Sequence, residues 1–76
     1  MPGRLSVQID GRTITVAPGE RIIVGRHPDC ALVVDHQLVS RTHLEVVEQD
    51  GRWVARDLDS ANGTFVAGRE TPVVAI

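Results

Sequence analysis

The chain has 76 residues, of which 42% are hydrophobic and 24% charged, and its formal net charge is −2. A chain of this length has material for one small core, so we expect residues 1–76 to form a single domain. Its apolar content is too high for a disordered tail. A pI near 5.8 argues against nucleic acid or an anionic membrane surface as a partner, because both require an extended basic surface.

The cysteine and arginine content narrows the class of protein further. Cys30 is the single cysteine, so no intrachain disulfide can form, as expected for a protein of the reducing cytoplasm. No stretch reads as a signal peptide or as a membrane span of roughly 20 apolar residues. All eight basic residues are arginine, and the guanidinium group suits bidentate recognition of phosphate or carboxylate.

The N-terminal part predicts a β-hairpin. Residues 5–9 and 12–16 both alternate apolar and polar side chains, and Asp10-Gly11 between them is typical of a two-residue turn with positive φ angles. This turn imposes a register that pairs Leu5 with Val16, Ser6 with Thr15, Val7 with Ile14 and Gln8 with Thr13.

The rest of the chain reads as further short strands separated by turns. A second Asp-Gly pair, Asp50-Gly51, predicts a hairpin that places Val47 opposite Val54 and Glu45 opposite Arg56. No stretch has helical periodicity over two turns, so we predict an all-β fold, an antiparallel β-sandwich. An apolar strand that reaches the last residue suggests that the natural domain continues and that its last strands are missing here. The expected strands cover residues 22–24, 32–34, 44–47, 53–55, 64–66 and 73–76.

Three polar loops stand out between these strands. They contain Gly25-Arg26, then Ser40-Arg41-Thr42-His43, then Ser60-Ala61-Asn62-Gly63-Thr64. Loops of a sandwich gather at its ends, so residues distant in sequence can meet on one rim. Two arginines, a serine and an asparagine on one rim are suited to binding an anion.

These three motifs in this order closely resemble the forkhead-associated (FHA) domain, a module that binds phosphothreonine peptides. The likeness runs from about residue 22 to residue 68, and Asp57-Leu58 and Val66-x-Gly68 also fit the family. The resemblance implies an eleven-stranded β-sandwich that binds its ligand with loops, uses no cofactor and has no catalytic activity. Relatives continue for about two more strands after the segment resembling residues 73–76.

The resemblance assigns roles to single residues. It implies that Arg26, Ser40 and Arg41 contact the phosphate, which carries about −1.5 to −2 charges and three acceptor oxygens at pH 7. Asn62 would hydrogen-bond the backbone of the peptide beside the phosphothreonine. Gly63 would supply a backbone angle closed to other residues.

Other positions would shape or support the site. Gly25, His43 and Thr64 are expected to be structural, with His43 tying the loops together from behind. The loop of residues 35–39 would determine which side chains are accepted along the peptide. Its apolar Leu38 and Val39 favour an apolar third residue after the phosphothreonine. Ala61 stands where relatives often have Ser or Thr, which predicts a missing hydroxyl contact and weaker binding. Ala67 stands where relatives commonly have Asn before Gly68, a difference that lies outside the expected binding site.

Several other interpretations of the same residues are open. Arg26 and Ser40-Arg41 are also compatible with an ordinary solvated surface. Ser40 together with His43 could form a hydrolase site, although no nucleophile elbow surrounds Ser40. Asn62-Gly63-Thr64 fits the N-glycosylation sequon. The cluster His27, Asp29, Cys30 and His36 suggests a metal, yet its spacing matches no familiar zinc pattern.

The two aromatic residues, Trp53 and Phe65, are expected in the core rather than on a base-stacking surface.

The favoured function is a cytoplasmic module that binds a phosphothreonine protein downstream of a Ser/Thr protein kinase. The alternative is a β-sandwich that serves assembly without phosphate. Gly51–Ala55 and Pro72–Val74 further resemble the N-terminal FHA module of bacterial ABC transporters. An exposed sheet edge would favour dimerisation.

Overall fold

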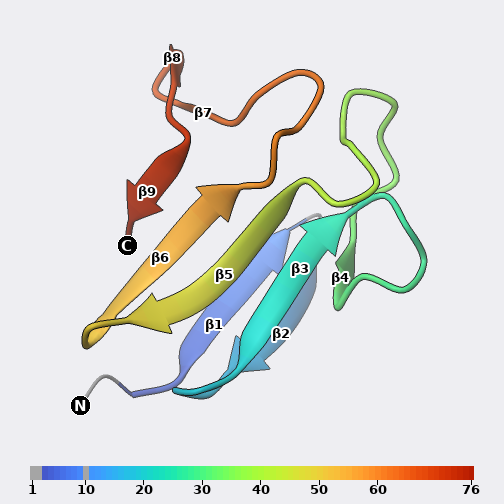
Figure 1. The fold of residues 1–76 in the computed structure, drawn as a ribbon. Coiled ribbons are helices and arrows are strands. Elements are labelled where there is room, and N and C mark those ends of the chain that lie inside the picture. Colours follow the sequence, from blue (N-terminus) through green and yellow to red (C-terminus); the bar gives the residue numbers. More distant parts are fainter. Residues whose placement is uncertain (1–2, 10) are drawn as a thin grey trace.

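The computed structural model describes residues 3–9 and 11–76, and the regular elements of that part are all β-strands (Figure 1). The predicted all-β class is therefore confirmed. The described residues include no helix long and apolar enough to cross a membrane. The strands are β1 (Leu5–Ile9), β2 (Arg12–Val16), β3 (Arg21–Gly25), β4 (Leu32–Val33), β5 (Leu44–Gln49), β6 (Arg52–Asp57), β7 (Phe65–Val66), β8 (Arg69–Glu70) and β9 (Val73–Ala75).

Both predicted hairpins form in the predicted register. β1 pairs with β2 antiparallel, with Leu5 opposite Val16 and Val7 opposite Ile14. Gly11 has the expected positive φ of 76°, while Asp10 lies outside the described residues. In the second hairpin, β5 pairs with β6 around Asp50 and Gly51, whose φ angles are 53° and 80°. The pairs Glu45–Arg56 and Val47–Val54 are those that the turn predicts.

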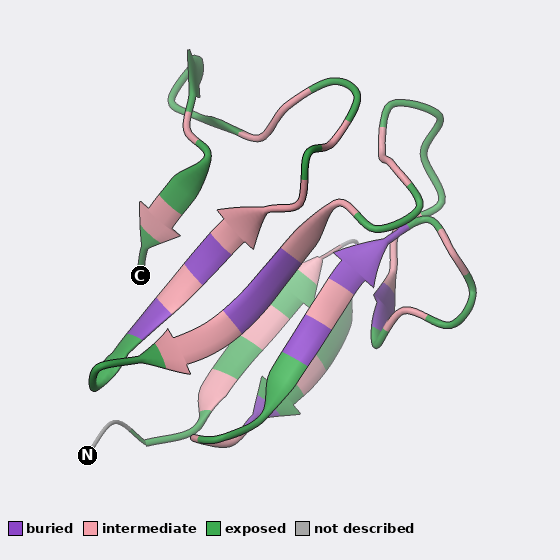
Figure 2. Ribbon diagram, in the orientation of Figure 1, coloured by how far each residue is buried: buried purple, intermediate pink, exposed green. Residues whose placement is uncertain are grey.

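The core lies between two layers of strands. A five-stranded sheet in the order β4-β3-β5-β6-β9 forms one layer, and the hairpin β1-β2 lies behind it (Figure 1). Buried and less buried residues alternate along β6, and along β3 as far as Val24 (Figure 2), because successive side chains of a strand point to opposite faces of the sheet. The resulting core contains Val16, Ile22, Val24, Leu32, Val46, Trp53 and Ala55, and the Trp53 indole nitrogen donates to the Gly3 carbonyl oxygen at 3.1 Å.

The outer face of the five-stranded sheet carries one buried charge. Glu45 is buried on this face, where the neighbouring strands β3 and β6 contribute Arg21 and Arg56. The Arg56 guanidinium lies 3.2 Å from one oxygen of Glu45, and Arg21 binds the other. The two ion pairs compensate the cost of burying the carboxylate.

Two expectations differ from the structure. β4 pairs with β3 in parallel rather than antiparallel, over the residue pairs Val24–Leu32 and Gly25–Val33. The chain turns back in the loop after β3, so that β4 then runs in the same direction as β3. Phe65 was expected in the core, but 59% of it is exposed. Its short strand β7 pairs with β8 and lies apart from the main sheet, so the prediction for Phe65 is wrong, whereas Trp53 is buried as predicted.

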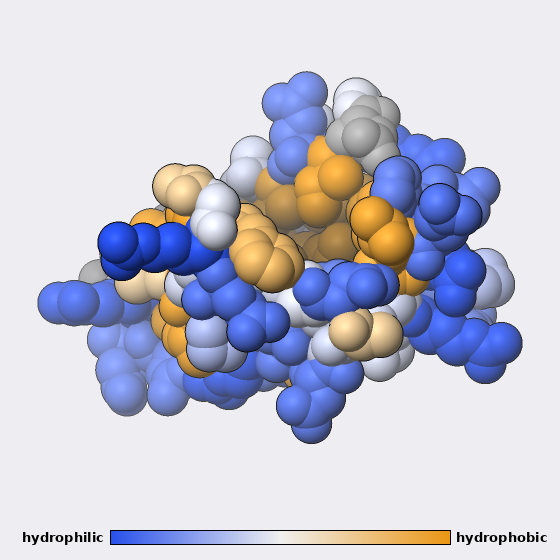
Figure 3. All heavy atoms as spheres, turned by 90° about the horizontal axis from the view of Figure 1, so that it is seen from above, coloured by the Kyte–Doolittle hydropathy of each residue, from blue (hydrophilic) through white to orange (hydrophobic). Residues whose placement is uncertain are grey.

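The hairpins β1-β2 and β7-β8 are separate two-stranded sheets with an apolar hollow between them. The hollow has a volume of about 290 Å³ and opens at the end of the molecule that Figure 3 views, where hydrophobic side chains lie below a ring of hydrophilic ones. It is lined by Ile9, Val24, Val34, Val39, His43, Leu44, Gly63, Thr64 and Phe65. Three of these residues, His43, Gly63 and Thr64, belong to the polar motifs.

Candidate functional site

The three polar loops meet at one end of the five-stranded sheet, beyond the ends of β3 and β6 and the start of β5 (Figure 1). Backbone hydrogen bonds join the first two loops: the amide of Arg26 donates to the Ser40 carbonyl at 3.0 Å, and that of His27 to the Arg41 carbonyl at 3.2 Å. Gly25 permits this approach, since a Cβ at this position would lie 2.1 Å from the Arg41 carbonyl oxygen. Gly25 is thus required for close packing and not for an unusual φ angle.

The second and third loops are joined through side chains. The amide of Ala61 donates to the Ser40 hydroxyl oxygen at 2.9 Å, and the Asn62 side-chain nitrogen donates to the Leu38 carbonyl at 3.0 Å. Ser40 acts as an acceptor in this contact, so its hydroxyl hydrogen can still be donated to a ligand. The oxygen of the Asn62 amide likewise remains an acceptor beside the joined loops.

His43 connects the same two loops from below. Its Nδ1 accepts from the Ser40 amide at 3.1 Å, which places the ring hydrogen on Nε2. That nitrogen lies 3.0 Å from the Gly63 carbonyl oxygen and donates to it. The side chain is only 13% exposed, so it holds the loops without facing the solvent side of the rim.

Gly63 is constrained by its backbone conformation. Its φ of 83° is one that residues with a side chain rarely adopt, whereas the carboxylate oxygen of Glu70 that would lie 2.5 Å from a Cβ belongs to an exposed side chain that can move away. Its backbone makes two contacts within the site, since the carbonyl accepts from His43 and the amide donates to the Ser60 hydroxyl at 3.0 Å.

Asp57 organises the third loop, a role that the sequence motifs do not assign to it. Its carboxylate accepts from the Ser60 amide at 3.0 Å, from the Ser60 hydroxyl, and from the Thr64 hydroxyl at 2.7 Å. The spacing of an aspartate three residues before a serine is a local signal for such a turn. Thr64 therefore supports the loop through its hydroxyl.

The hydrogen bonds also set the protonation of Asp57. Burial of the carboxyl raises its pKa, but the hydrogen bonds from Ser60 and Thr64 and the nearby His43 ring outweigh burial and lower the pKa below the ordinary value of 3.8. The His43 Nε2 lies 3.8 Å from the Asp57 carboxylate. Asp57 is thus an anion at neutral pH and a permanent acceptor for the loop.

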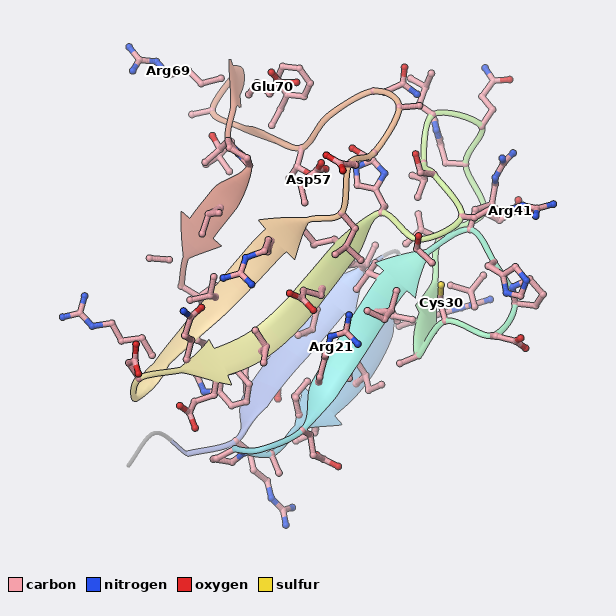
Figure 4. The ribbon with its side chains drawn as sticks, viewed as in Figure 1. Arg21, Cys30, Arg41, Asp57, Arg69 and Glu70 are labelled. Carbon is pink, nitrogen blue, oxygen red and sulfur yellow. The ribbon has the colours of Figure 1, made fainter. Side chains whose placement is uncertain are left out.

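The two arginines of the motifs are held by their backbones and extend outward. Both residues are exposed, and Arg41 projects from the loops at the edge of the molecule (Figure 4). Within residues 3–9 and 11–76, neither guanidinium has a hydrogen-bond or ion-pair partner. Each is therefore available to an anionic ligand at the rim.

The remaining predicted positions divide between rim and interior. Leu38 is 56% exposed at the rim, and Ala61 is exposed beside Ser40. Val39 is half-buried and lines the apolar hollow. The loops therefore bring Arg26, Leu38, Ser40, Arg41, Ala61 and Asn62 to one rim, with Gly25, His43, Gly63 and Thr64 beneath it.

Two other interpretations fit this geometry poorly. A hydrolase site needs a hydrogen bond from the nucleophile to the base, whereas His43 Nδ1 accepts from the Ser40 amide and the Ser40 hydroxyl contacts Ala61. In the suspected metal cluster, the His27 Nδ1 accepts from the Asp29 amide at 3.0 Å, and the Cys30 thiol donates to the Arg41 carbonyl at 3.2 Å. These side chains stabilise their own loops.

Comparison with known proteins agrees with this description. The model of the FHA domain family matches residues 22–75. The ABC transporter ATP-binding/permease protein Rv1747 of Mycobacterium tuberculosis is 41% identical over 75 residues, which cover 99% of this chain and 9% of the transporter. The resemblance to an FHA module of a bacterial ABC transporter is thereby confirmed, although the chain spans less than a tenth of that relative.

Solved structures give the same result. The crystal structure of the FHA-1 domain of Rv1747 from M. tuberculosis matches with a TM-score of 0.96 at 41% identity, over 100% of this chain and 78% of that chain. A structure from a study of phosphothreonine-dependent FHA domain interactions matches with a TM-score of 0.76 at 27% identity, over 96% of this chain and 75% of that chain. The chain belongs to the FHA domain family.

Proposed function

We propose that this chain is a phosphothreonine-binding module that recruits a partner phosphorylated by a Ser/Thr protein kinase. The observation that carries the proposal is the convergence of Arg26, Ser40, Arg41 and Asn62 on one rim, on loops tied together by hydrogen bonds. A rim fixed before the ligand arrives avoids part of the ordering cost of binding. Membership of the FHA family supports a binding role.

Each group of the rim has a defined chemical task in this proposal. The guanidiniums of Arg26 and Arg41 form charge-assisted hydrogen bonds with the phosphate oxygens. The Ser40 hydroxyl, whose oxygen accepts from the Ala61 amide, donates its hydrogen to a third phosphate oxygen. The Asn62 amide oxygen accepts a backbone N–H of the peptide, while its nitrogen stays bound to the Leu38 carbonyl.

The rim reconciles an acidic chain with an anionic ligand. The net charge of −2 is a property of the whole chain, whereas the phosphate meets the two exposed arginines of the rim. Local charge of this kind gives affinity through short contacts rather than through long-range attraction, which physiological salt screens beyond about 8 Å. We therefore infer a specific contact and not general anion binding.

The relationship to the transporter suggests the setting. A module 41% identical to part of the transporter Rv1747 is proposed to act as a cytoplasmic regulatory domain of a longer protein, which it would connect to kinase signalling. No direct contact of the module with the membrane or with nucleic acid is proposed, since both would require a basic surface.

Calorimetric titration tests the proposal. The folded chain is titrated with a degenerate phosphothreonine peptide pool and with the same pool unphosphorylated. We expect binding of the phosphorylated pool only, and at least a tenfold loss in the Arg26→Ala variant, because a charge-assisted contact is lost. Arg52→Ala, which removes an exposed arginine from the opposite end of the sheet, is the matched control.

Two results would contradict the proposal. Equal binding of both pools would favour the alternative, an assembly domain that does not need phosphate. Absence of any binding by a protein whose fold is verified by circular dichroism would show that the rim does not recognise phosphothreonine.

A further inference from the structure

A second cavity lies beside the proposed phosphate site. Its volume is about 410 Å³, and it is lined by Arg12, Arg26, Val33 and Asp35. Arg12 belongs to strand β2 and not to the three recognition loops. Its guanidinium donates to the Val33 carbonyl at 3.4 Å, a contact that holds the side chain against β4.

The sheet order places this cavity at one end of the rim. β4 is one edge strand of the sheet and is followed by β3, β5, β6 and β9. Arg26 follows β3 and Asn62 follows β6, so the cavity lies on the far side of Arg26 from Asn62. A peptide in extended conformation advances about 3.3 Å per residue. A peptide anchored on Asn62 and on the phosphate site therefore carries its flanking residues toward the β4 edge.

The charge of the cavity defines what it can bind. Among the residues that the structure describes, two arginines and one aspartate line the cavity and give it a charge of +1, and Val33 is the one apolar residue of that lining. Arginine binds carboxylates through two parallel hydrogen bonds. Arg26 is committed to the phosphate in the proposed complex, which leaves Arg12 to bind a second anion. Asp35 opposes that anion and limits the affinity.

We infer that this cavity is a subsite for an acidic residue of the phosphothreonine ligand and that Arg12 is the residue that reads it. The inference rests on the proposed function and adds a specificity determinant to it. It also separates two parts of the rim. Leu38, joined to Asn62, offers an apolar contact at one end, and Arg12 offers an ionic contact at the other.

Selection from a peptide library tests this inference. The probe is a pool with a fixed phosphothreonine and randomised flanking positions, captured by the folded 76-residue chain and sequenced by position. We expect enrichment of Asp and Glu at one flanking position. A fixed pair of phosphopeptides that differ by Glu or Gln at that position is then titrated, and the Glu peptide should bind about three to ten times more tightly.

Variants assign the preference to the cavity. Arg12→Ala should reduce the ratio between the Glu and Gln peptides to about one, and Asp35→Asn should increase it, because the two side chains act on the ligand carboxylate with opposite signs. Arg52→Ala removes the same charge from the opposite end of the sheet and should leave the ratio unchanged. Added salt should reduce the ratio in the wild-type chain.

The outcomes separate this inference from the proposed function. Binding that needs phosphate and Arg26 but shows no acidic preference, or a preference that survives Arg12→Ala, would overturn the subsite and leave phosphothreonine recognition standing. Absence of phosphate-dependent binding in the folded protein would overturn both.

Discussion

Gly25 and Arg41 are in backbone contact at the point where the first two recognition loops meet. A Cβ on Gly25 would lie 2.1 Å from the Arg41 carbonyl oxygen and 3.0 Å from that of Ser40. Both carbonyls are already held as acceptors by the amides of Arg26 and His27. The loop that carries two of the proposed phosphate ligands is therefore positioned by the absence of a side chain at residue 25.

The variant Gly25→Ala should consequently lose both stability and binding. The loops must separate to admit the methyl group, and overpacking of this kind costs about 2–3 kcal/mol. Urea denaturation measures the free energy of unfolding, and titration with a phosphothreonine peptide measures the affinity. Gly3→Ala is the control, because no atom lies within 4 Å of a Cβ at that position. Equal stability of the two variants would contradict the proposed role of Gly25.

The elements that the sequence predicts best are those set by local chemistry. Two Asp-Gly turns determine the hairpins β1-β2 and β5-β6, including the opposition of Glu45 and Arg56. A two-residue turn with positive φ angles, together with the requirement that the apolar positions all face the core, leaves a single register for the hairpin. The site motifs are predictable for a related reason, since each is a short continuous segment.

Features that depend on distant partners were not predictable. Phe65 has apolar neighbours in sequence, yet it is exposed because β7 pairs with β8 and not with the main sheet. The parallel pairing of β4 depends on the path of the preceding loop. The family resemblance implies that His43 ties the loops together, but its partner, the carbonyl of Gly63 20 residues further along the chain, is known only once β5 and the third loop are placed in space.

His43 should matter for affinity although it lies below the rim. His43→Ala removes both the acceptor for the Ser40 amide and the donor to the Gly63 carbonyl. The loss of two half-buried hydrogen bonds costs about 1–3 kcal/mol, and the loosened loops must be ordered again on binding. We expect weaker phosphopeptide binding together with faster hydrogen exchange at residues 40 and 63. His27→Ala, in the adjacent loop, should have a smaller effect on both measurements, and the reverse order would refute this role.

Asp57 predicts a specific pH dependence of stability. Its pKa is lowered in the folded chain relative to the ordinary value of 3.8, so the folded state favours the anion. The stabilisation is complete above the unfolded pKa and is lost as the pH falls through the lower pKa of the folded state. Asp57→Asn should therefore be less stable than the wild-type chain by about 1–2 kcal/mol at neutral pH.

Urea denaturation of both proteins across pH measures this difference. The difference in the free energy of unfolding should remain constant from pH 7 to about pH 5 and shrink once the pH falls below the ordinary pKa of 3.8. Asp59→Asn is a suitable control, because Asp59 is an exposed neighbour in the same loop. A difference that persists unchanged in strong acid would show that Asp57 does not stabilise the loop as an anion.

Ala61 offers a test by gain of function. Its amide binds the Ser40 hydroxyl oxygen at 2.9 Å, and its exposed side chain supplies no hydroxyl to the rim. Ala61→Ser should strengthen binding of a phosphothreonine peptide by about two- to tenfold, the range of one added hydrogen bond. The unphosphorylated peptide should bind neither the variant nor the wild-type chain. Unchanged affinity for the phosphopeptide would place residue 61 outside the reach of the phosphate.

The edge of β1 predicts self-association of this 76-residue chain. Within the described residues β1 pairs only with β2, and the apolar hollow lies on the side toward β7. Unpaired backbone groups beside apolar side chains are a template for another strand. We expect sedimentation velocity to show a dimer that increases with concentration, and Ser6→Lys, a charge on the exposed side of β1, to weaken it. A monomer at all concentrations would show that the edge is protected.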